Sequence, residues 1–493
     1  MKPLKFFDNM LNSVTMYRLL VYGLSGLIVI AATFSFTGVL SLSGPGLLVS
    51  AVILASVCYL SNKLMSYTLS APVNTESYLI TALILVCILP PATTVERAVY
   101  IALAGAIAMV SKFIMSYRHV HIFNPAAFAA AAVSLLGLLP VTWWIGRPAL
   151  LPFTALFGVF LLRKIHRFTM FFVFAAVTMA VLAVVAFNTD QEVLVLIKNA
   201  WLSGPLVFFG TVMLTEPATM PALRYYHVLY AIIVGGLYSA QARIGVFSTS
   251  PHMVLLAGNI FAYAVNPRVH RLLTFKERIR ISDKVYDYVF TPNKPFRFIP
   301  GQYMEWTLPH KHVDTRGNRR TFTIASSPTE KEVHLGIKFY EPSSTFKRFL
   351  KDMDPGHTLV MSHIAGSFVL PHDRSEKLVL IAGGIGITPF RSQIKYLLDT
   401  KQKRDIVLLY FVNTSDELAY KEVFRDAKKA GVTFVPVAGA MLEKKLLEKA
   451  VPDYKERMHY ISGPNGLVDS YKHLLRQAGV PKRRIVTDYF PGY

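Results

Sequence analysis

Residues 378–390 read LVLIAGGIGITPF, and this stretch decides the fold of the C-terminal part of the chain. An apolar run of the kind buried as a strand passes into a glycine-rich turn, and a threonine and a proline then begin a helix. The residues of this turn are Gly383, Gly384, Gly386, Thr388 and Pro389. Because glycine has no Cβ, anionic groups can approach backbone amides at the helix N-terminus. The stretch therefore predicts a site for the phosphates of a dinucleotide, against the alternative of a tight turn without a ligand.

The sequence around this turn predicts two soluble domains. From residue 373 to 493, apolar runs alternate with helical stretches, which is typical of a parallel, doubly wound α/β sheet. Between residues 271 and 372, short alternating runs are separated by Pro, Gly and Asn, which is typical of a small antiparallel β-barrel.

Two motifs in the expected barrel suit a flavin. In RRTFTIAS, residues 319–326, strand alternation places Arg320 and Phe322 on one face and Thr323 on the other. A guanidinium suits a flavin diphosphate, whereas an aromatic ring and a hydroxyl suit the isoalloxazine. In PSSTF, residues 342–346, the amides and hydroxyls before a predicted helix suit the same diphosphate, and they belong to Ser343, Ser344 and Thr345. Taken alone, each motif is more typical of an ordinary surface strand or a helix cap than of a cofactor site.

Together these motifs resemble the ferredoxin-NADP reductase superfamily over residues 272–493. The resemblance implies that FAD binds along Arg320, Phe322, Thr323 and Ser326, and that a nicotinamide nucleotide binds along residues 383–389. It also implies that two C-terminal segments lie beside the nicotinamide. The residues concerned are Ser462, Gly463 and Pro464 in ISGP, and Phe490 and Tyr493 in DYFPGY.

Within that resemblance, Ser462 stands where many members carry a cysteine. Hydride transfer requires stacked rings at the right distance and no side-chain acid, so we expect this serine to tune the reaction without abolishing it. Phe490 and Tyr493 are candidates to cover the flavin ring, with plain packing of the chain end as the alternative. Residues 412–417 and 438–442 contain no arginine for a 2'-phosphate, which favours NADH over NADPH, although Lys444 and Lys445 could reverse this preference.

The first 270 residues have a different composition. The whole chain has a mean hydropathy of +0.40 and only 17% charged residues, and the apolar excess lies between residues 17 and 267. We therefore predict a polytopic α-helical membrane domain over 1–270 with about ten spans. The expected spans are 17–37, 46–64, 77–91, 98–116, 124–143, 149–163, 168–187, 193–213, 225–241 and 253–267.

The distribution of charge predicts the orientation of these spans. With a cytoplasmic N-terminus, the inside segments hold most of the Lys and Arg residues, while the outside loops hold only Arg97, Arg147 and Arg243. The expected location is therefore the inner (cytoplasmic) membrane, in contact with lipid and with both termini and the reductase domains in the cytoplasm. The net charge of +22 fits contact with anionic lipid better than nucleic-acid binding. The two cysteines, Cys58 and Cys87, encode no iron–sulfur cluster, and we predict no metal site.

Proline interrupts the helical pattern in two segments, HIFNPAA at 121–127 and LTEPATMP at 214–221. Such breaks persist at membrane depth only when they are buried in protein or line a cavity, so they are candidates for a flavin site or an ion path. The residues concerned are Asn124, Pro125, Thr215 and Glu216. Equally consistent with the sequence is a pair of helix-start loops at the cytoplasmic face.

Residues 75–267 resemble the RnfD/NqrB subunits of ion-pumping, NADH-dependent redox complexes, through LPP at 89–91, HIFNPAA, TEPAT and GNI at 258–260. That family holds flavins in its membrane domain, one often joined to a threonine of a Ser-Gly-Ala-Thr motif. This chain lacks the motif, which leaves non-covalent FMN or riboflavin as the expectation.

The two resemblances imply an enzyme, an NAD(P)H-dependent flavoprotein oxidoreductase. In this interpretation, hydride passes from NADH to FAD. Electrons then pass, directly or through a separate carrier protein, to a cofactor in the membrane domain and on to a quinone or an extracytoplasmic acceptor. This transfer could also be coupled to ion movement. One alternative is a transporter gated by the reductase. Another is a haem-dependent transmembrane reductase, which is disfavoured because His119, His121, His166, His227 and His252 lie in loops or at the ends of spans.

Overall fold

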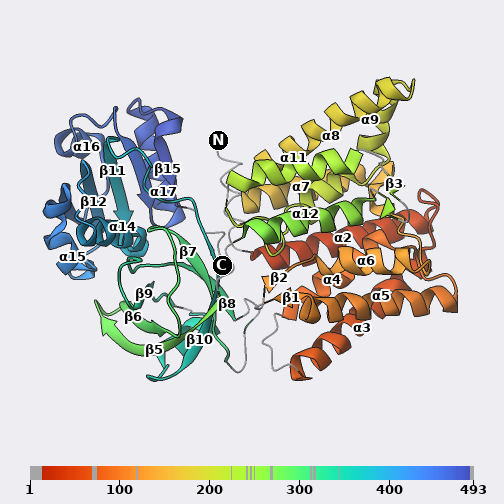
Figure 1. Cartoon of the computed structure of the whole chain (residues 1–493), viewed down its shortest axis with the longest axis horizontal. Coiled ribbons are helices and arrows are strands. Elements are labelled where there is room, and N and C mark those ends of the chain that lie inside the picture. Colours follow the sequence, from red (N-terminus) through yellow and green to blue (C-terminus); the bar gives the residue numbers. More distant parts are fainter. Residues whose placement is uncertain are drawn as a thin grey trace. The chain divides into compact units, whose positions relative to one another are not determined.

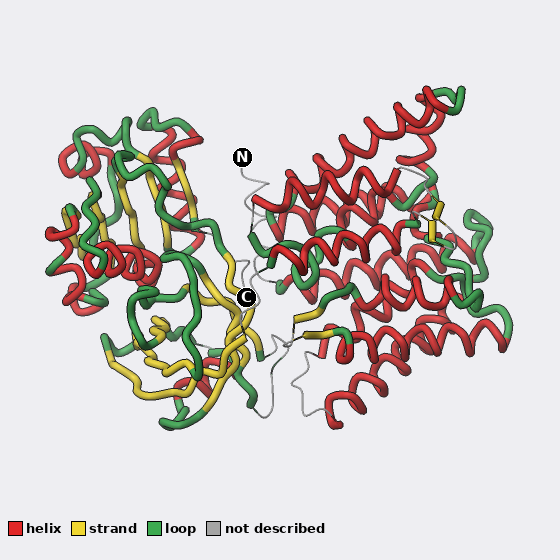
Figure 2. The backbone as a smooth tube through the Cα atoms, in the orientation of Figure 1, coloured by secondary structure: helices red, strands yellow, loops and turns green. Residues whose placement is uncertain are grey.

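The computed structural model describes residues 11, 14–68, 75–117, 120–223, 225–239, 243–244, 247–248, 250–266, 270–310, 314, 318–341 and 343–488. These residues fall into two compact units, one within residues 1–268 and one within residues 269–490 (Figure 1). The first unit is helical, and the second contains two sheets with flanking helices (Figure 2).

The helical unit is built from helices joined by short connections. They are α2 (Met16–Phe36), α3 (Gly44–Thr68), α4 (Thr75–Ile88), α5 (Val95–Ile114), α6 (Pro125–Leu135), α7 (Leu151–Ile165), α8 (Phe168–Asn188), α9 (Val193–Leu202), α10 (Leu206–Phe208) with a following π-helix (Phe209–Met213), α11 (Tyr225–Ser239) and α12 (Pro251–Val265). Two short hairpins accompany them, β1 (Ser116–Tyr117) with β2 (Val120–His121), and β3 (Arg243–Ile244) with β4 (Phe247–Ser248).

The expected count of about ten membrane spans is too high. Each predicted stretch contains a helix, but among the described residues only five helices are long and apolar enough to cross a membrane. The count becomes six if α9 and the helical segment Leu206–Met213, which are bent by 63° at a break, form one span. Helices α11 and α12 have 15 residues each, or about 22 Å at 1.5 Å per residue, against a hydrocarbon core of about 30 Å. Hydropathy detected these apolar segments but did not reveal how early their helices end.

Small residues bring the helices of this unit close together. Thr178 on α8 donates a hydrogen bond to the carbonyl oxygen of Gly235 on α11 at 3.4 Å. A Cβ at Gly235 would lie 2.9 Å from the carbonyl oxygen of Phe174, so only glycine allows this approach. Close backbone contact of this kind is how apolar helices associate where water supplies no driving force.

The second unit begins with a six-stranded antiparallel sheet in the order β8-β7-β10-β5-β6-β9. Its elements are β5 (His270–Arg280), β6 (Val285–Pro292), β7 (Tyr303–Thr307), β8 (Arg319–Thr323), β9 (Val333–Lys338), α13 (Thr345–Lys351) and β10 (Thr358–Ala365). The expected barrel is thus a curled sheet whose edge strands are β8 and β9. The amide of Ala325 donates to the carbonyl of His334 at 3.0 Å, which joins the two edges just beyond β8.

A five-stranded parallel sheet follows, in the order β13-β12-β11-β14-β15. Its elements are β11 (Leu378–Gly383), α14 (Thr388–Asp399), β12 (Ile406–Val412), α15 (Lys421–Arg425), β13 (Val432–Ala438), α16 (Lys444–Ala450), β14 (Met458–Ser462), α17 (Asn465–Gln477) and β15 (Ile485–Thr487). Separate apolar cores pack on its two faces, as the predicted doubly wound sheet requires. The strand order reverses between β11 and β14, and open α/β sheets bind ligands at such a point, beyond the carboxyl ends of the strands.

Candidate functional site

The glycine-rich turn lies at the carboxyl end of β11, where the strand order reverses. Gly384 has a φ of +54°, and nothing lies within 4 Å of the position that a Cβ would take. Its backbone is therefore open to a ligand, and its left-handed conformation disfavours a side chain. The short 3-10 helix Gly384–Ile387 then leads into α14, which Thr388 and Pro389 begin as predicted.

The neighbouring strand β14 brings ISGP beside this turn. Ser462 pairs in register with Ala382, and a Cβ at Gly386 would lie 2.5 Å from the carbonyl oxygen of Ser462 and 2.6 Å from the backbone of Gly463. Glycine at position 386 is thus required for the two strand ends to meet. Pro464 follows and occupies the N-cap position of α17. The structure therefore places residues 383–389 and 462–464, which are far apart in sequence, at one edge of the sheet.

Ser462 is buried, and its hydroxyl donates to a carboxylate oxygen of Asp488 at 3.0 Å. The amide of Asp488 in turn donates to the carbonyl oxygen of Ile461 at 2.9 Å, which holds this carboxylate against the end of β14. Sequence reasoning included Asp488 only as the first letter of a C-terminal motif and assigned it no contact. The predicted ring-covering residues Phe490 and Tyr493 lie outside the described residues.

Arg320 and Phe322 lie on one face of β8, as alternation predicts. The guanidinium of Arg320 is 5.2 Å from the centroid of the Phe346 ring, and the ring of Phe322 lies 6.0 Å from the same ring. Arg320 is only 4% exposed, and Thr323 is buried on the same strand. Phe346 is the second residue of α13, so this contact brings the two predicted flavin motifs together.

An anion already lies between these motifs. A carboxylate oxygen of Asp314 is 3.8 Å from a guanidinium nitrogen of Arg320, and its other oxygen accepts the amide of Thr345 at 3.0 Å. The hydroxyl of Thr345 also accepts the amide of Asp314 at 3.0 Å. The donor set thus holds a carboxylate as a stand-in for a phosphate, so these residues fit the diphosphate of a flavin. Asp314 was not predicted, because it lies in a different loop from either motif.

The remaining predicted hydroxyls are engaged by the protein itself. Ser326 accepts the amide of His334 at 3.2 Å, and Ser344 caps α13 by accepting the amide of Lys347 at 3.3 Å. The hydroxyls of Ser343 and Thr388 donate to the carbonyl oxygens of Tyr340 and Ile385 at 2.7 and 3.1 Å. In this structure these hydroxyls stabilise local turns and caps, and each keeps one further hydrogen-bonding site.

A buried polar network that sequence reasoning missed joins the two sheets. The hydroxyl of Tyr420 donates to Asp287 on β6 at 3.0 Å, and His334 on β9 lies 2.7 Å from the other oxygen of that carboxylate. Arg391 on α14 packs 5.5 Å from the Tyr420 ring centroid and pairs with Glu330. Burial, followed by the Asp287 carboxylate, raises the pKa of Tyr420 well above its usual value. The network holds α14, and hence the glycine-rich turn, against the six-stranded sheet.

In the helical unit, the two proline-interrupted segments meet. The side-chain amide of Asn124 donates to Glu216 at 2.6 Å, and the hydroxyl of Thr219 donates to the same carboxylate oxygen at 3.0 Å. Asn259 on α12 accepts the backbone amide of Asn124 at 2.9 Å and donates to the carbonyl oxygen of Thr219 at 3.2 Å. These four residues form a polar cluster at the start of α6. Sequence reasoning quoted Asn259 in the GNI segment but did not include it as a site residue.

Pro125 and Thr215, the other two predicted residues of this region, have structural roles. Asn124 caps α6 by accepting the amide of Ala127 at 2.9 Å, and Pro125 occupies the first turn. Thr215, in the turn after the π-helix, donates its hydroxyl to the carbonyl oxygen of Thr211. The cluster therefore combines a helix cap with a half-buried carboxylate, and a flavin site or an ion path at this place stays a prediction.

Comparison with known proteins concerns the C-terminal half. A family model described as an oxidoreductase NAD-binding domain matches residues 380–473. The reductase component of propane 2-monooxygenase from Rhodococcus jostii (strain RHA1) is 27% identical over 213 residues, which are 40% of this chain and 56% of that protein. A flavohemoprotein from Bacillus thuringiensis subsp. konkukian (strain 97-27) is 24% identical over 239 residues, 43% of this chain and 59% of that protein. The C-terminal half matches an FAD/NAD-binding module of the ferredoxin-NADP reductase type.

The chain thus spans less than two thirds of the length of these curated relatives. Among solved structures, the Amycolatopsis cytochrome P450 reductase is similar with a TM-score of 0.41 and 22% identity, covering 46% of this chain and 71% of that one. The matches to reductases support the predicted NAD(P)H-dependent flavoprotein oxidoreductase. The RnfD/NqrB resemblance of residues 75–267 stays a prediction.

Proposed function

We propose that this protein is a membrane-bound flavin reductase that transfers hydride from NADH to FAD and passes the electrons to an acceptor reached through the membrane. The observation that carries this proposal is that one unit holds two sites suited to phosphate. At the first, the ends of β11 and β14 meet beside the open backbone of Gly384, and at the second, Arg320 and the amide of Thr345 contact a carboxylate. The first arrangement suits the phosphates of a nicotinamide nucleotide, and the second suits those of a flavin.

In the flavin site, Arg320 and the amide of Thr345 bind the diphosphate, and Phe322 and Thr323 line the position of the isoalloxazine. Bound FAD supplies the chemistry of accepting two electrons and a proton as hydride. The protein contributes position: it holds the nicotinamide beside the flavin and keeps water out, and no side chain has to gain or lose a proton.

In the nucleotide site, the backbone of Gly384 and the first turn of α14 bind phosphate. The paired Ser462 and Asp488 border the place of the nicotinamide, and their mutual hydrogen bond fixes the serine hydroxyl. Without an arginine in residues 412–417 or 438–442 to bind a 2'-phosphate, the site prefers NADH.

For the helical unit, we propose a role in carrying electrons onward, with non-covalent FMN or riboflavin as a cofactor and a quinone or an extracytoplasmic compound as acceptor. The half-buried carboxylate of Glu216, held by Asn124 and Thr219, supports a second role as part of an ion path coupled to this transfer. We place the unit in the cytoplasmic membrane with the reductase module in the cytoplasm.

The test uses the purified full-length chain and its Glu216→Gln and Asn124→Ala variants. Two activities are measured, NADH oxidation with ferricyanide, which takes electrons from the reductase module, and NADH oxidation with a soluble quinone analogue. We expect both variants to keep the activity with ferricyanide and to lose most of the activity with the quinone analogue. Retention of both activities would exclude a role of the cluster in onward transfer.

A further inference from the structure

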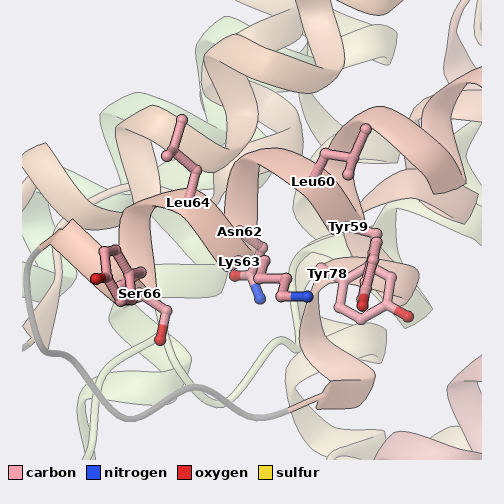
Figure 3. Close-up of a pocket in the computed structure, with 8 residues that line it drawn as sticks. Tyr59, Leu60, Asn62, Lys63, Leu64, Ser66 and Tyr78 are labelled. Atoms are coloured by element: carbon pink, nitrogen blue, oxygen red, sulfur yellow. The ribbon is translucent and has the colours of Figure 1, made fainter.

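A pocket of about 690 Å³ lies between the last turns of α3 and the first turn of α4 (Figure 3). Side chains at helical spacing on α3 supply most of its lining, and Tyr78 on α4 supplies the rest. The lining residues are Tyr59, Leu60, Asn62, Lys63, Leu64, Ser66, Tyr67 and Tyr78.

The cation of this pocket is available to a ligand. Lys63 extends toward the rings of Tyr59 and Tyr78, and its ammonium lies 5.9 Å from the centroid of the Tyr59 ring (Figure 3). Within the part of the chain that the structure describes, no carboxylate forms an ion pair with Lys63. The pocket therefore carries an uncompensated positive charge held over an aromatic face.

Asn62 is the second observation that points to a ligand. Its side chain lines the pocket although the residue is only 6% exposed, and its buried carbonyl oxygen Oδ1 has no hydrogen-bond partner among the described residues. A buried amide without a partner costs about 1–3 kcal/mol, so its retention needs a reason. The orphaned oxygen is an acceptor and needs a donor such as a lipid hydroxyl, whereas the NH₂ of the same side chain can donate to a phosphate.

The position of the pocket along α3 indicates which layer of the membrane surrounds it. This helix has 25 residues and qualifies as a membrane span, and it is about 37 Å long, which exceeds a hydrocarbon core of about 30 Å. Its last turns therefore reach the head-group layer, where tyrosine and lysine are enriched. Leu60 and Leu64, which are 62% and 58% exposed, lie one turn apart on the same helix and continue the pocket with an apolar surface.

We propose that this pocket binds an anionic phospholipid. The phosphate accepts hydrogen bonds from the ammonium of Lys63 and the amide of Asn62, and an acyl chain lies along Leu60 and Leu64. A quinone head fits less well, because it offers no charge to Lys63. The rings of Tyr59 and Tyr78 also pack against each other, with centroids 5.6 Å apart and planes at 59°, which leaves no slot for a flat ring between them.

The test counts bound lipids by native mass spectrometry on the full-length protein, delipidated in detergent and then offered phosphatidylglycerol or phosphatidylcholine with identical acyl chains. The variants are Lys63→Gln, Asn62→Leu and the charge-conserving Lys63→Arg. Lys198→Gln is the matched control, because it removes one exposed lysine from α9 in the same unit. Monodisperse elution in size-exclusion chromatography is required of each variant before lipids are counted.

The wild-type protein, Lys63→Arg and Lys198→Gln are expected to retain phosphatidylglycerol over phosphatidylcholine by about fivefold, the effect of one lysine near a lipid phosphate. Lys63→Gln is expected to lose that preference, and Asn62→Leu to weaken phosphatidylglycerol binding. If Lys63→Gln does not remain folded, Asn62→Leu gives the deciding measurement. The proposal is overturned if Lys63→Gln or Asn62→Leu binds phosphatidylglycerol like the wild type, if the wild type does not distinguish the two lipids, or if a short-chain quinone displaces the bound phosphatidylglycerol.

Discussion

Asp314 lies against Arg320, with a carboxylate oxygen 3.8 Å from the guanidinium of the arginine. The second carboxylate oxygen accepts the amide of Thr345 at the start of α13. A cation and a helix amide therefore already share one anion inside the proposed flavin site. A flavin diphosphate that binds the same two donors has to displace this carboxylate.

Replacing Asp314 by Asn should strengthen FAD binding. The change keeps the shape of the side chain and removes the negative charge that competes with the diphosphate for Arg320. A gain of about 1 kcal/mol in the free energy of FAD binding corresponds to an approximately fivefold lower dissociation constant. This constant is measured by titrating the apoprotein with FAD and following flavin fluorescence. Asp283→Asn is the control, because it neutralises an exposed carboxylate that pairs with Arg280. Weaker binding by Asp314→Asn would mean that the carboxylate supports the site.

Replacing Arg320 by Gln should weaken FAD binding. Hydrogen bonds to charged groups contribute about 1.5–3 kcal/mol, so the dissociation constant should rise by roughly 10- to 100-fold, and the protein should lose flavin during purification. The measurement is the ratio of extracted FAD to protein. Arg319→Gln serves as the neighbouring control, since that guanidinium pairs with Glu305 on the adjacent strand. Equal flavin content in both variants would contradict the assignment of Arg320.

Replacing Gly384 by Ala should raise the KM for NADH and leave the FAD content unchanged. A Cβ at a φ of +54° costs about 1–2 kcal/mol, and it covers the backbone that faces the phosphates. We expect a KM increase of roughly tenfold in steady-state NADH oxidation with ferricyanide. Gly466→Ala in α17 adds a methyl group where nothing lies within 4 Å, and its KM should match the wild type. A normal KM for Gly384→Ala would place the nucleotide elsewhere.

The reductase unit should lose stability as the pH falls from about 6.5 toward 4. Burial lowers the pKa of His459 to about 4, while its Nε2 lies 2.7 Å from the carbonyl oxygen of Tyr454. Since the folded pKa lies below the unfolded value of about 6.5, the unfolded chain takes up a proton first and gains stability on acidification. Between pH 7 and 5, the titration of His459 lowers the free energy of unfolding by about 2 kcal/mol.

The thermal unfolding of the reductase unit at several pH values measures this dependence. His459→Gln carries no titrating group at this position, so its melting temperature should fall less between pH 7 and 5 than that of the wild type. The same pH profile in both proteins would show that His459 does not titrate as its burial implies.

Features that depend on a short stretch of sequence were predictable. The turn at Gly384, the start of α14 and the N-cap at Asn124 each follow from a few adjacent residues, and the structure has all three. The meeting of Arg320 and Phe322 on one face followed from strand alternation. Local chemistry fixes such features before any tertiary contact forms.

Features that depend on which distant loops meet were not predictable. Asp314 reaches Thr345 from a separate loop, and Tyr420 reaches Asp287 across more than a hundred residues, so no periodicity signals either contact. The contact between the hydroxyl of Ser326 and the backbone amide of His334 likewise joins two strands and was not predicted, while its role in flavin binding stays a prediction. The number of spans was too high because an apolar stretch shows where a helix lies but not how long it is.

The central claim is that NADH reduces a flavin bound to this chain, and anaerobic addition of NADH to the purified full-length protein tests it most directly. The account predicts that the protein retains FAD and that one equivalent of NADH bleaches the absorbance of this FAD, more rapidly than NADPH does. A purified, monodisperse protein that holds no flavin, or that holds FAD which NADH leaves oxidised, would contradict it.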